Sequence, residues 1–98
     1  MTHCKGCNKH LAADARSRAS ISILAQGDER TLSWWLCDVC DAYTRNEYVD
    51  RFHGEPDEYF YGPFPKEIGD ADLVRVSTCP APDDKWCRCE THRHFGSD

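Results

Sequence analysis

The chain has 98 residues, enough for one domain with at most a second small lobe, and an apolar core of this size is thin. Its 17 acidic and 12 basic residues give a formal net charge of −5, which disfavours nucleic acid as a partner because phosphate backbones bind basic surfaces. No apolar run reaches the length of a transmembrane helix, and the first residues lack the apolar stretch of a signal peptide, so we expect a cytoplasmic protein with no membrane contact.

The chain has seven cysteines, and their compartment and number favour metal over disulfides. Cytosolic thiols stay reduced, and an odd count would leave one thiol over in a disulfide framework, which remains the alternative. Seven thiolates with two divalent ions would bring the net charge to about −8. Two short basic groups keep a local nucleic-acid contact open: Arg16 with Arg18, and Arg88 with Arg93.

The first predicted element is a metal knuckle over residues 3–10. Cys4 and Cys7 form a C-x2-C pair, and Gly6 eases the tight turn between them. A polar connector over residues 11–18 follows and predicts no regular structure beyond a short helical turn.

A β-hairpin is predicted next. Residues 19–26 and residues 32–36 both alternate between apolar and polar side chains, as half-buried strands do. Gly27 and Asp28 between them form a Gly-X turn signal. The hairpin leads directly into a second C-x2-C pair, Cys37 and Cys40.

Residues 41–53 are predicted to form a helix that starts at this second pair. Apolar residues recur there at helical spacing: Val39, Ala42, Tyr43, Val49 and Phe52. Asp38 or Asp41 can cap its start, while Gly54 ends it and Pro56 prevents its return.

The order of knuckle, hairpin and helix resembles the treble-clef and zinc-ribbon-like zinc-binding domains over about residues 3–54. The resemblance rests on element order and on the C-x2-C spacing. It implies a zinc site but no particular activity, because treble clefs serve many roles.

The C-terminal half predicts a second, smaller unit. Residues 55–66 are rich in proline and aromatic residues and predict an irregular loop, whereas residues 71–78 predict a strand with Val74 and Val76 on one side. The remaining tail predicts a second knuckle. We therefore expect a small metal-stabilised α+β domain.

Its two parts divide at residue 54. Residues 1–54 form a treble-clef-like zinc module, and residues 55–98 add the aromatic loop, the strand and a second Cys3His zinc site. We expect the second part to pack on the first as one compact domain.

Two closed tetrahedral sites account for all seven cysteines and one histidine. The first has four predicted ligands: Cys4, Cys7, Cys37 and Cys40. The second has the pattern C-x7-C-x-C-x2-H, with ligands Cys79, Cys87, Cys89 and His92. His94 is the alternative to His92, and His3 or His10 could approach from the N-terminus. We expect two Zn²⁺ per chain.

Iron is the alternative metal at the first site. The length between the two pairs and the position of Trp35, two residues before Cys37, also resemble rubredoxin, a one-iron electron carrier. Rubredoxin knuckles place glycine after each second cysteine, where this chain has Asn8 and Asp41. The predicted helix after Cys40 also fits a treble clef better, and zinc is therefore favoured.

The sequence indicates no enzyme. Closed sites leave no position for a substrate, and the chain has neither a Gly-rich phosphate loop nor a G-x-S-x-G elbow. The triplet at residues 53–55 resembles the H-x-E half of a zinc-deaminase signature, but the downstream cysteines stand in the wrong order, so it is interpreted as a helix end. We expect no catalytic residue and no small-molecule substrate.

By elimination we predict a protein-interaction or regulatory module with a protein partner. An aromatic cluster either binds that partner or covers an otherwise open core: Tyr59, Phe60, Tyr61 and Phe64. Adjacent acids, which usually mark solvated turns, offer further contacts: Asp57, Glu58, Asp83 and Asp84. The alternatives are a rubredoxin-like electron carrier and a zinc-finger nucleic-acid-binding protein. The three tryptophans are interpreted as core or as shielding of the metal sites.

Overall fold

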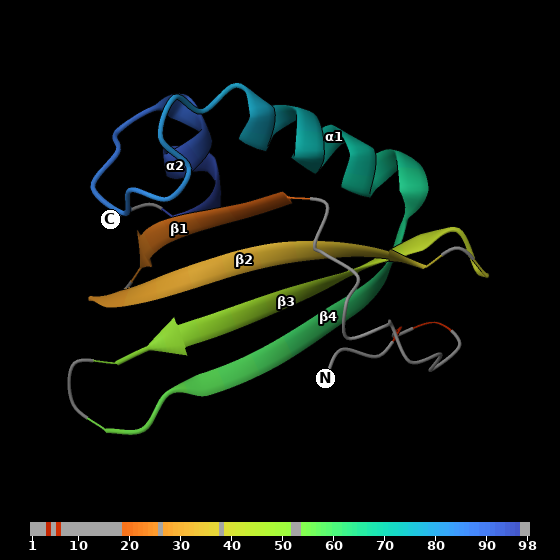
Figure 1. The fold of residues 1–98 in the computed structure, drawn as a ribbon, viewed down its shortest axis with the longest axis horizontal. Coiled ribbons are helices and arrows are strands. Elements are labelled where there is room, and N and C mark those ends of the chain that lie inside the picture. The colour runs from red at the N-terminus through yellow and green to blue at the C-terminus, as the bar shows by residue number, and fades with distance from the viewer. Residues whose placement is uncertain are drawn as a thin grey trace.

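The computed structural model describes residues 4, 6, 19–25, 27–37, 39–51 and 54–96. They form a four-stranded antiparallel sheet in the order β1-β2-β3-β4, followed by two helices (Figure 1). The elements are β1 (Ala19–Ala25), β2 (Asp28–Cys37), β3 (Ala42–Asp50), β4 (Asp57–Pro65), α1 (Lys66–Ser77) and α2 (Glu90–Phe95). The predicted small α+β domain is confirmed.

The predicted hairpin is β1 and β2, and it is confirmed. Its register pairs Ile21 with Leu32 and closes at Ala25 and Asp28. Gly27 lies in the turn with φ of 81°, in the left-handed region that glycine adopts without strain. Antiparallel pairing places the apolar residues of the two strands on one face, as their alternation predicts.

Helix α1 contacts all four strands and covers this apolar face. Trp34 of β2 is fully buried there, and the ring of Phe95 in α2 packs 5.3 Å from the Trp34 ring. At the other end, the Tyr43 hydroxyl donates a hydrogen bond of 2.6 Å to Asp70 of α1. The core thus lies between the sheet and the two helices, which Figure 1 shows together on the side of β1.

The predicted helix over residues 41–53 is wrong: the second cysteine pair leads into strand β3. Val49 lies seven residues after Ala42, a spacing that suits one face of a helix, but six residues after Tyr43, a spacing that suits one face of a strand. Tyr43 and Val49 are both buried in the sheet. Pairing with β2 along the whole of β3 decides in favour of the strand, and the aromatic and β-branched residues there suit it. The element order is therefore not that of a treble clef. Residues 52 and 53 lie outside the described residues.

The predicted strand over residues 71–78 is also wrong, because it falls largely within helix α1. A strand would place Val74 and Val76 on one face, yet Val76 is buried and Val74 is exposed. Two residues span about 200° around a helix, which separates these side chains.

The predicted irregular loop over residues 55–66 contains strand β4. The glycine and prolines of this stretch are compatible with a strand because β4 is an edge strand, where one row of backbone groups needs no partner. The pairing with β3 shifts register between Tyr43 and Arg45, opposite the Gly62–Pro63 cis peptide bond. Strands from both sides of residue 54 thus belong to one sheet.

Neither of the helices described is long and apolar enough to cross a membrane.

Candidate metal centres

The C-terminal cluster brings together four ligand atoms, from Cys79, Cys87, Cys89 and His92, all within 4.8 Å of one another. The Nδ1 atom of His92 lies 3.3 Å from Sγ of Cys79 and 3.3 Å from Sγ of Cys89. The Sγ atom of Cys79 lies 3.4 Å from that of Cys89 and 3.9 Å from that of Cys87. Two sulfurs bonded to one zinc in tetrahedral geometry are about 3.8 Å apart. These separations therefore leave room for one central ion of that size.

Three parts of the chain position these ligands. Cys79 follows the end of α1, and Cys89 caps the start of α2, where its Sγ accepts the backbone N–H of His92 at 3.4 Å. The Thr91 hydroxyl donates to the Arg75 carbonyl at 2.8 Å and holds α2 against α1. The intervening loop is fixed to the sheet, because the Ser22 N–H donates to the Pro82 carbonyl at 2.7 Å. The convergence thus depends on tertiary contacts as well as on ligand spacing.

His92 joins the cysteines, whereas His94 does not. The His92 side chain is buried within the cluster, while His94 is exposed and packs edge-on against Phe95, with ring centroids 4.8 Å apart. The Nε2 atom of His92 is buried and has no hydrogen-bond partner among the described residues. Since a ligating histidine usually donates its second ring N–H to a neighbouring acceptor, this atom lacks an expected contact.

The two thiols nearest the histidine differ in acidity. Burial raises the pKa of Cys79, and only a backbone hydrogen bond near Ala81 opposes it. Burial also opposes ionisation of Cys89, yet hydrogen bonds from the backbone N–H and the ring of His92 lower its pKa below the ordinary value. Of these two thiols, Cys89 is thus the one that ionises more readily and is available first for a metal ion.

The second group of cysteines lies at the start of β3. Ligand atoms of Cys4, Cys37 and Cys40 lie within 4.8 Å of one another, and the Sγ atoms of Cys4 and Cys40 are 3.1 Å apart. Cys4 and Cys37 are buried and Cys40 is exposed, while Trp35 packs against the buried pair as shielding. Cys7, the fourth predicted ligand, lies outside the described residues, as do His3 and His10.

The backbone around these cysteines has the features of metal knuckles. The Gly6 N–H donates to Sγ of Cys4 at 3.3 Å, and a Cβ at residue 6 would lie only 3.2 Å from Sγ of Cys40. After the second pair, Asp41 has φ of 53° and donates its N–H to the Cys37 carbonyl at 2.9 Å. Asp41 thus adopts the left-handed conformation that a glycine would take there, although the residue is not glycine.

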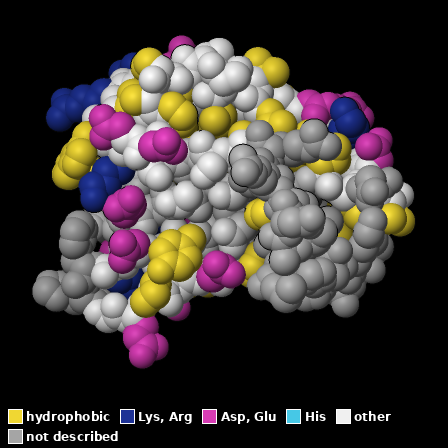
Figure 2. Space-filling model, viewed as in Figure 1, with side chains coloured by type: hydrophobic (Ala, Val, Ile, Leu, Met, Phe, Trp, Pro, Cys, Tyr) yellow, Lys and Arg dark blue, Asp and Glu magenta, His cyan; other side chains and the backbone are white. Residues whose placement is uncertain are grey.

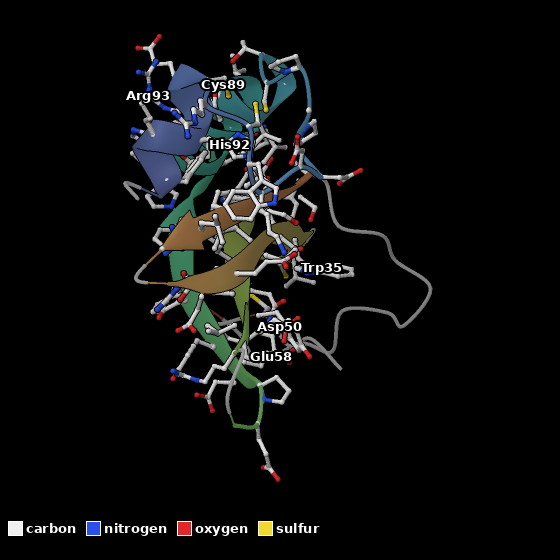
Figure 3. All side chains as sticks on the ribbon, turned by 90° about the vertical axis from the view of Figure 1, so that its left-hand side faces the viewer. Trp35, Asp50, Glu58, Cys89, His92 and Arg93 are labelled. Atoms are coloured by element: carbon white, nitrogen blue, oxygen red, sulfur yellow. The ribbon has the colours of Figure 1, made fainter. Side chains whose placement is uncertain are left out.

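The two clusters are separate centres. Figure 3 shows Cys89, His92 and Arg93 together at the end of the molecule formed by α2, whereas Trp35, beside the first cluster, lies away from them. Both groups could hold metal ions, and the identity of the metal is not determined by these contacts.

The predicted aromatic cluster is divided between two roles. Phe64 packs against the core, whereas Tyr59 and Tyr61 are 41% and 39% exposed, with ring centroids 6.5 Å apart. The Arg45 guanidinium lies 5.1 Å from the Tyr61 ring and 5.5 Å from the Phe64 ring. Sequence reasoning missed Arg45, because its contact with β4 follows from strand pairing and has no local signature.

Asp84, one of the predicted adjacent acids, lies in a solvent-exposed turn. Its carboxylate is exposed and accepts the backbone N–H of Trp86 at 2.9 Å. His53, which begins the H-x-E triplet, lies outside the described residues.

Comparison with known proteins gives no assignment: no protein-family model matches the chain, and searches of the curated proteins and of the solved structures find no significant match. The function must be inferred from the site itself.

Proposed function

We propose that this protein is a non-catalytic zinc protein that binds a protein partner or regulates one, with a Cys4 site at Cys4, Cys7, Cys37 and Cys40 and a Cys3His site at Cys79, Cys87, Cys89 and His92. The convergence of three thiols and one imidazole at the second cluster carries the proposal. Thiolates with imidazole suit zinc, and a full set of four protein ligands leaves no position for a substrate.

The metal at the second cluster has a structural task. Helix α2 has only six residues, too few to be stable alone. Its Phe95 nevertheless covers the Trp34 ring at 5.3 Å. An ion bonded to Cys79 after α1 and to Cys89 and His92 of α2 would hold this short helix in place, so metal binding and core formation are coupled.

Native mass spectrometry with elemental analysis tests the metal assignment on protein purified without added metal. We expect two zinc ions per chain. A His92→Ala variant should lose one ion, whereas His94→Ala, which changes an exposed histidine two residues away, should keep both. Retention of both ions by His92→Ala, or their loss from His94→Ala, would refute the second site.

The surface around Tyr59, Tyr61 and Arg45 supports a protein partner. Two half-exposed tyrosines next to an arginine are the residue types enriched at the centres of protein interfaces. Edge strand β4 carries both tyrosines, and extended partners can pair with such an edge. This aromatic surface is therefore the proposed contact.

A double variant, Tyr59→Ser with Tyr61→Ser, tests this surface in quantitative affinity capture. We expect it to lose specific partners that the unchanged protein retains. Tyr48→Ser is the matched control, because Tyr48 is 40% exposed but lies on the opposite face of the sheet. Tyr59 pairs with Glu47, the residue next to Tyr48, and successive residues of a strand point to opposite faces. Equal loss in both variants, or no loss in either, would contradict the assignment.

A rubredoxin-like electron carrier is the second candidate. Two differences from rubredoxin favoured zinc, and the structure weakens both: Asp41 has the backbone conformation of the expected glycine, and a strand rather than a helix follows Cys40. One bound iron, visible colour and a reversible redox couple would support this candidate and exclude a closed zinc site at the first cluster.

A further inference from the structure

A pocket of about 510 Å³ lies beside the second cluster, between α2, the loop before it and β1. This volume is in the range of small-molecule sites. The described residues that line it include three cations and no acidic residue, although the protein as a whole is acidic: the cations are Lys85, Arg88 and Arg93. The local charge is thus opposite to the net charge.

Two of these cations have no acidic partner within the part of the chain that the structure describes. Among the described residues, neither Arg88 nor Arg93 forms an ion pair, while Lys85 pairs with Glu29 of β2 at 2.9 Å. A divalent ion with three thiolates at the adjacent cluster carries a charge of about −1, and Glu29 compensates Lys85, so Arg88 and Arg93 leave an excess of about +1. Figure 2 shows Lys and Arg side chains, with Asp and Glu side chains beside them, at the corner that α2 and its preceding loop occupy in Figure 1. Because no acidic side chain among the described residues lines the pocket, it can attract an anion although the protein carries a net negative charge.

An aromatic ring completes the pocket. Trp86 is 67% exposed, unusual for the largest side chain in a small protein, and it lines the pocket with Leu24. Its backbone is held by the hydrogen bond to Asp84, and Nζ of Lys85 lies 5.8 Å from its ring centroid. An exposed ring beside arginines is suited to stacking on a flat aromatic group next to a phosphate.

His92 connects the pocket to the metal cluster. Its Nδ1 faces Cys79 and Cys89, it is only 4% exposed, and it also lines the pocket. The other ring nitrogen, Nε2, has no hydrogen-bond partner in the described parts of the chain. When a metal ion occupies Nδ1, the proton of the neutral imidazole must be on Nε2, which then needs an acceptor.

We propose that this pocket binds a small anionic molecule with a flat aromatic group, of the nucleoside monophosphate class. The phosphate would be bound by Arg88 and Arg93 and would accept from Nε2 of His92, and the base would stack on Trp86. A single small anion fits the local excess of positive charge, whereas a long polyanion would also meet the acidic remainder of the surface. The part of His92 in this site rests on the proposed metal at the second cluster.

The test is a calorimetric titration of the metal-loaded protein with AMP at low ionic strength. The metal content is measured in the same sample. We expect saturable binding of one AMP per chain. Adenosine and inorganic phosphate should each bind at least about tenfold more weakly, because each lacks one of the two contacts.

Variants identify the residues. Arg88→Ala with Arg93→Ala, and separately Trp86→Ala, should each weaken AMP binding about tenfold or more while both metal ions remain. Trp86→Phe should bind AMP more tightly than Trp86→Ala, since phenylalanine retains an aromatic face. Arg75→Ala, an exposed arginine of α1 outside the pocket, is the matched control and should have no effect.

Three results would overturn the inference. These are no AMP binding by protein that holds both metal ions, binding that the pocket variants leave unchanged, and binding of a single-stranded oligonucleotide much tighter than that of AMP. A protein that lacks metal would instead contradict the proposed function, and the metal count separates these cases. If Arg88 and Arg93 only balance the charge of the thiolates, their replacement would lower metal retention without any AMP binding to lose.

Discussion

Replacement of Gly69 by alanine tests how α1 lies on the sheet, because sequence and structure predict opposite signs. In a helix interior alanine is more favourable than glycine by about 1 kcal/mol. Gly69 is buried, however, and a Cβ there would overlap the Tyr43 ring, at 2.5 Å from its Cγ atom. Carbon atoms of this kind normally approach no closer than about 3.5 Å.

Neither side of this contact can move freely. Tyr43 is buried, and its hydroxyl donates a hydrogen bond to Asp70, the residue after Gly69 in α1. The backbone of Tyr43 pairs with Leu36 on one side and with Phe64 on the other. Overpacking of a core costs about 1–3 kcal/mol, and an overlap with a ring fixed at both ends belongs at the upper end. After the gain in helix propensity, Gly69→Ala should lower the free energy of unfolding by about 2 kcal/mol, or the Tm by about 10 °C.

Urea denaturation at fixed metal concentration, followed by circular dichroism, measures this difference. Ala71→Gly is the matched control, because residue 71 is exposed on the same helix and should lose only the propensity of about 1 kcal/mol. Stability of Gly69→Ala equal to or above that of the unchanged protein would show that α1 does not pack on Tyr43.

Three further predictions concern the metal centres. Removal of metal by a chelator should release α2 and Phe95 from Trp34. In a variant whose other two tryptophans are replaced by phenylalanine, the fluorescence emission of Trp34 should then shift to the red. An unchanged spectrum would show that α2 docks without metal. If α2 instead stays docked without metal, iodoacetamide at about pH 7 should modify Cys89 before Cys79. The contacts with His92 lower the pKa of Cys89 to about 6 and keep it largely thiolate, whereas burial raises the pKa of Cys79 to about 11 and keeps it protonated; mass spectrometry of the peptides gives the order, and the reverse order would contradict it. Asp41→Gly should raise the free energy of unfolding by about 1 kcal/mol, because glycine adopts φ of 53° without strain; a loss of stability would mean that the aspartate side chain has a role of its own.

Local patterns were sufficient where one segment contains its own signal. The hairpin followed from the alternation of apolar and polar residues on both sides of Gly27, and the register of β1 and β2 agrees with it. The grouping of the C-terminal cysteines with a histidine followed from ligand spacing, and the four atoms do converge. In both cases the decisive contacts are close in sequence or belong to a chemically unusual set of residues.

Local patterns failed where two structures satisfy the same spacing. Val49 is in helical spacing with Ala42 and in strand spacing with Tyr43, and only pairing with β2 and β4 decided for the strand. For α1 the sequence shows alternating valines, yet the buried Gly69 against Tyr43 and the buried Val76 place this segment as a helix across the sheet. Long-range burial outweighs the small free-energy differences of intrinsic propensity.

The sequence by itself thus determined the hairpin, the residues available for metal and the acidic character of the protein. Only the tertiary structure decided that His92 rather than His94 faces the thiols, and that Arg88 and Arg93 line a pocket beside it. The physical reason is that ligand type is a property of each residue, whereas the direction of a side chain on a six-residue helix depends on how that helix packs against α1 and Trp34.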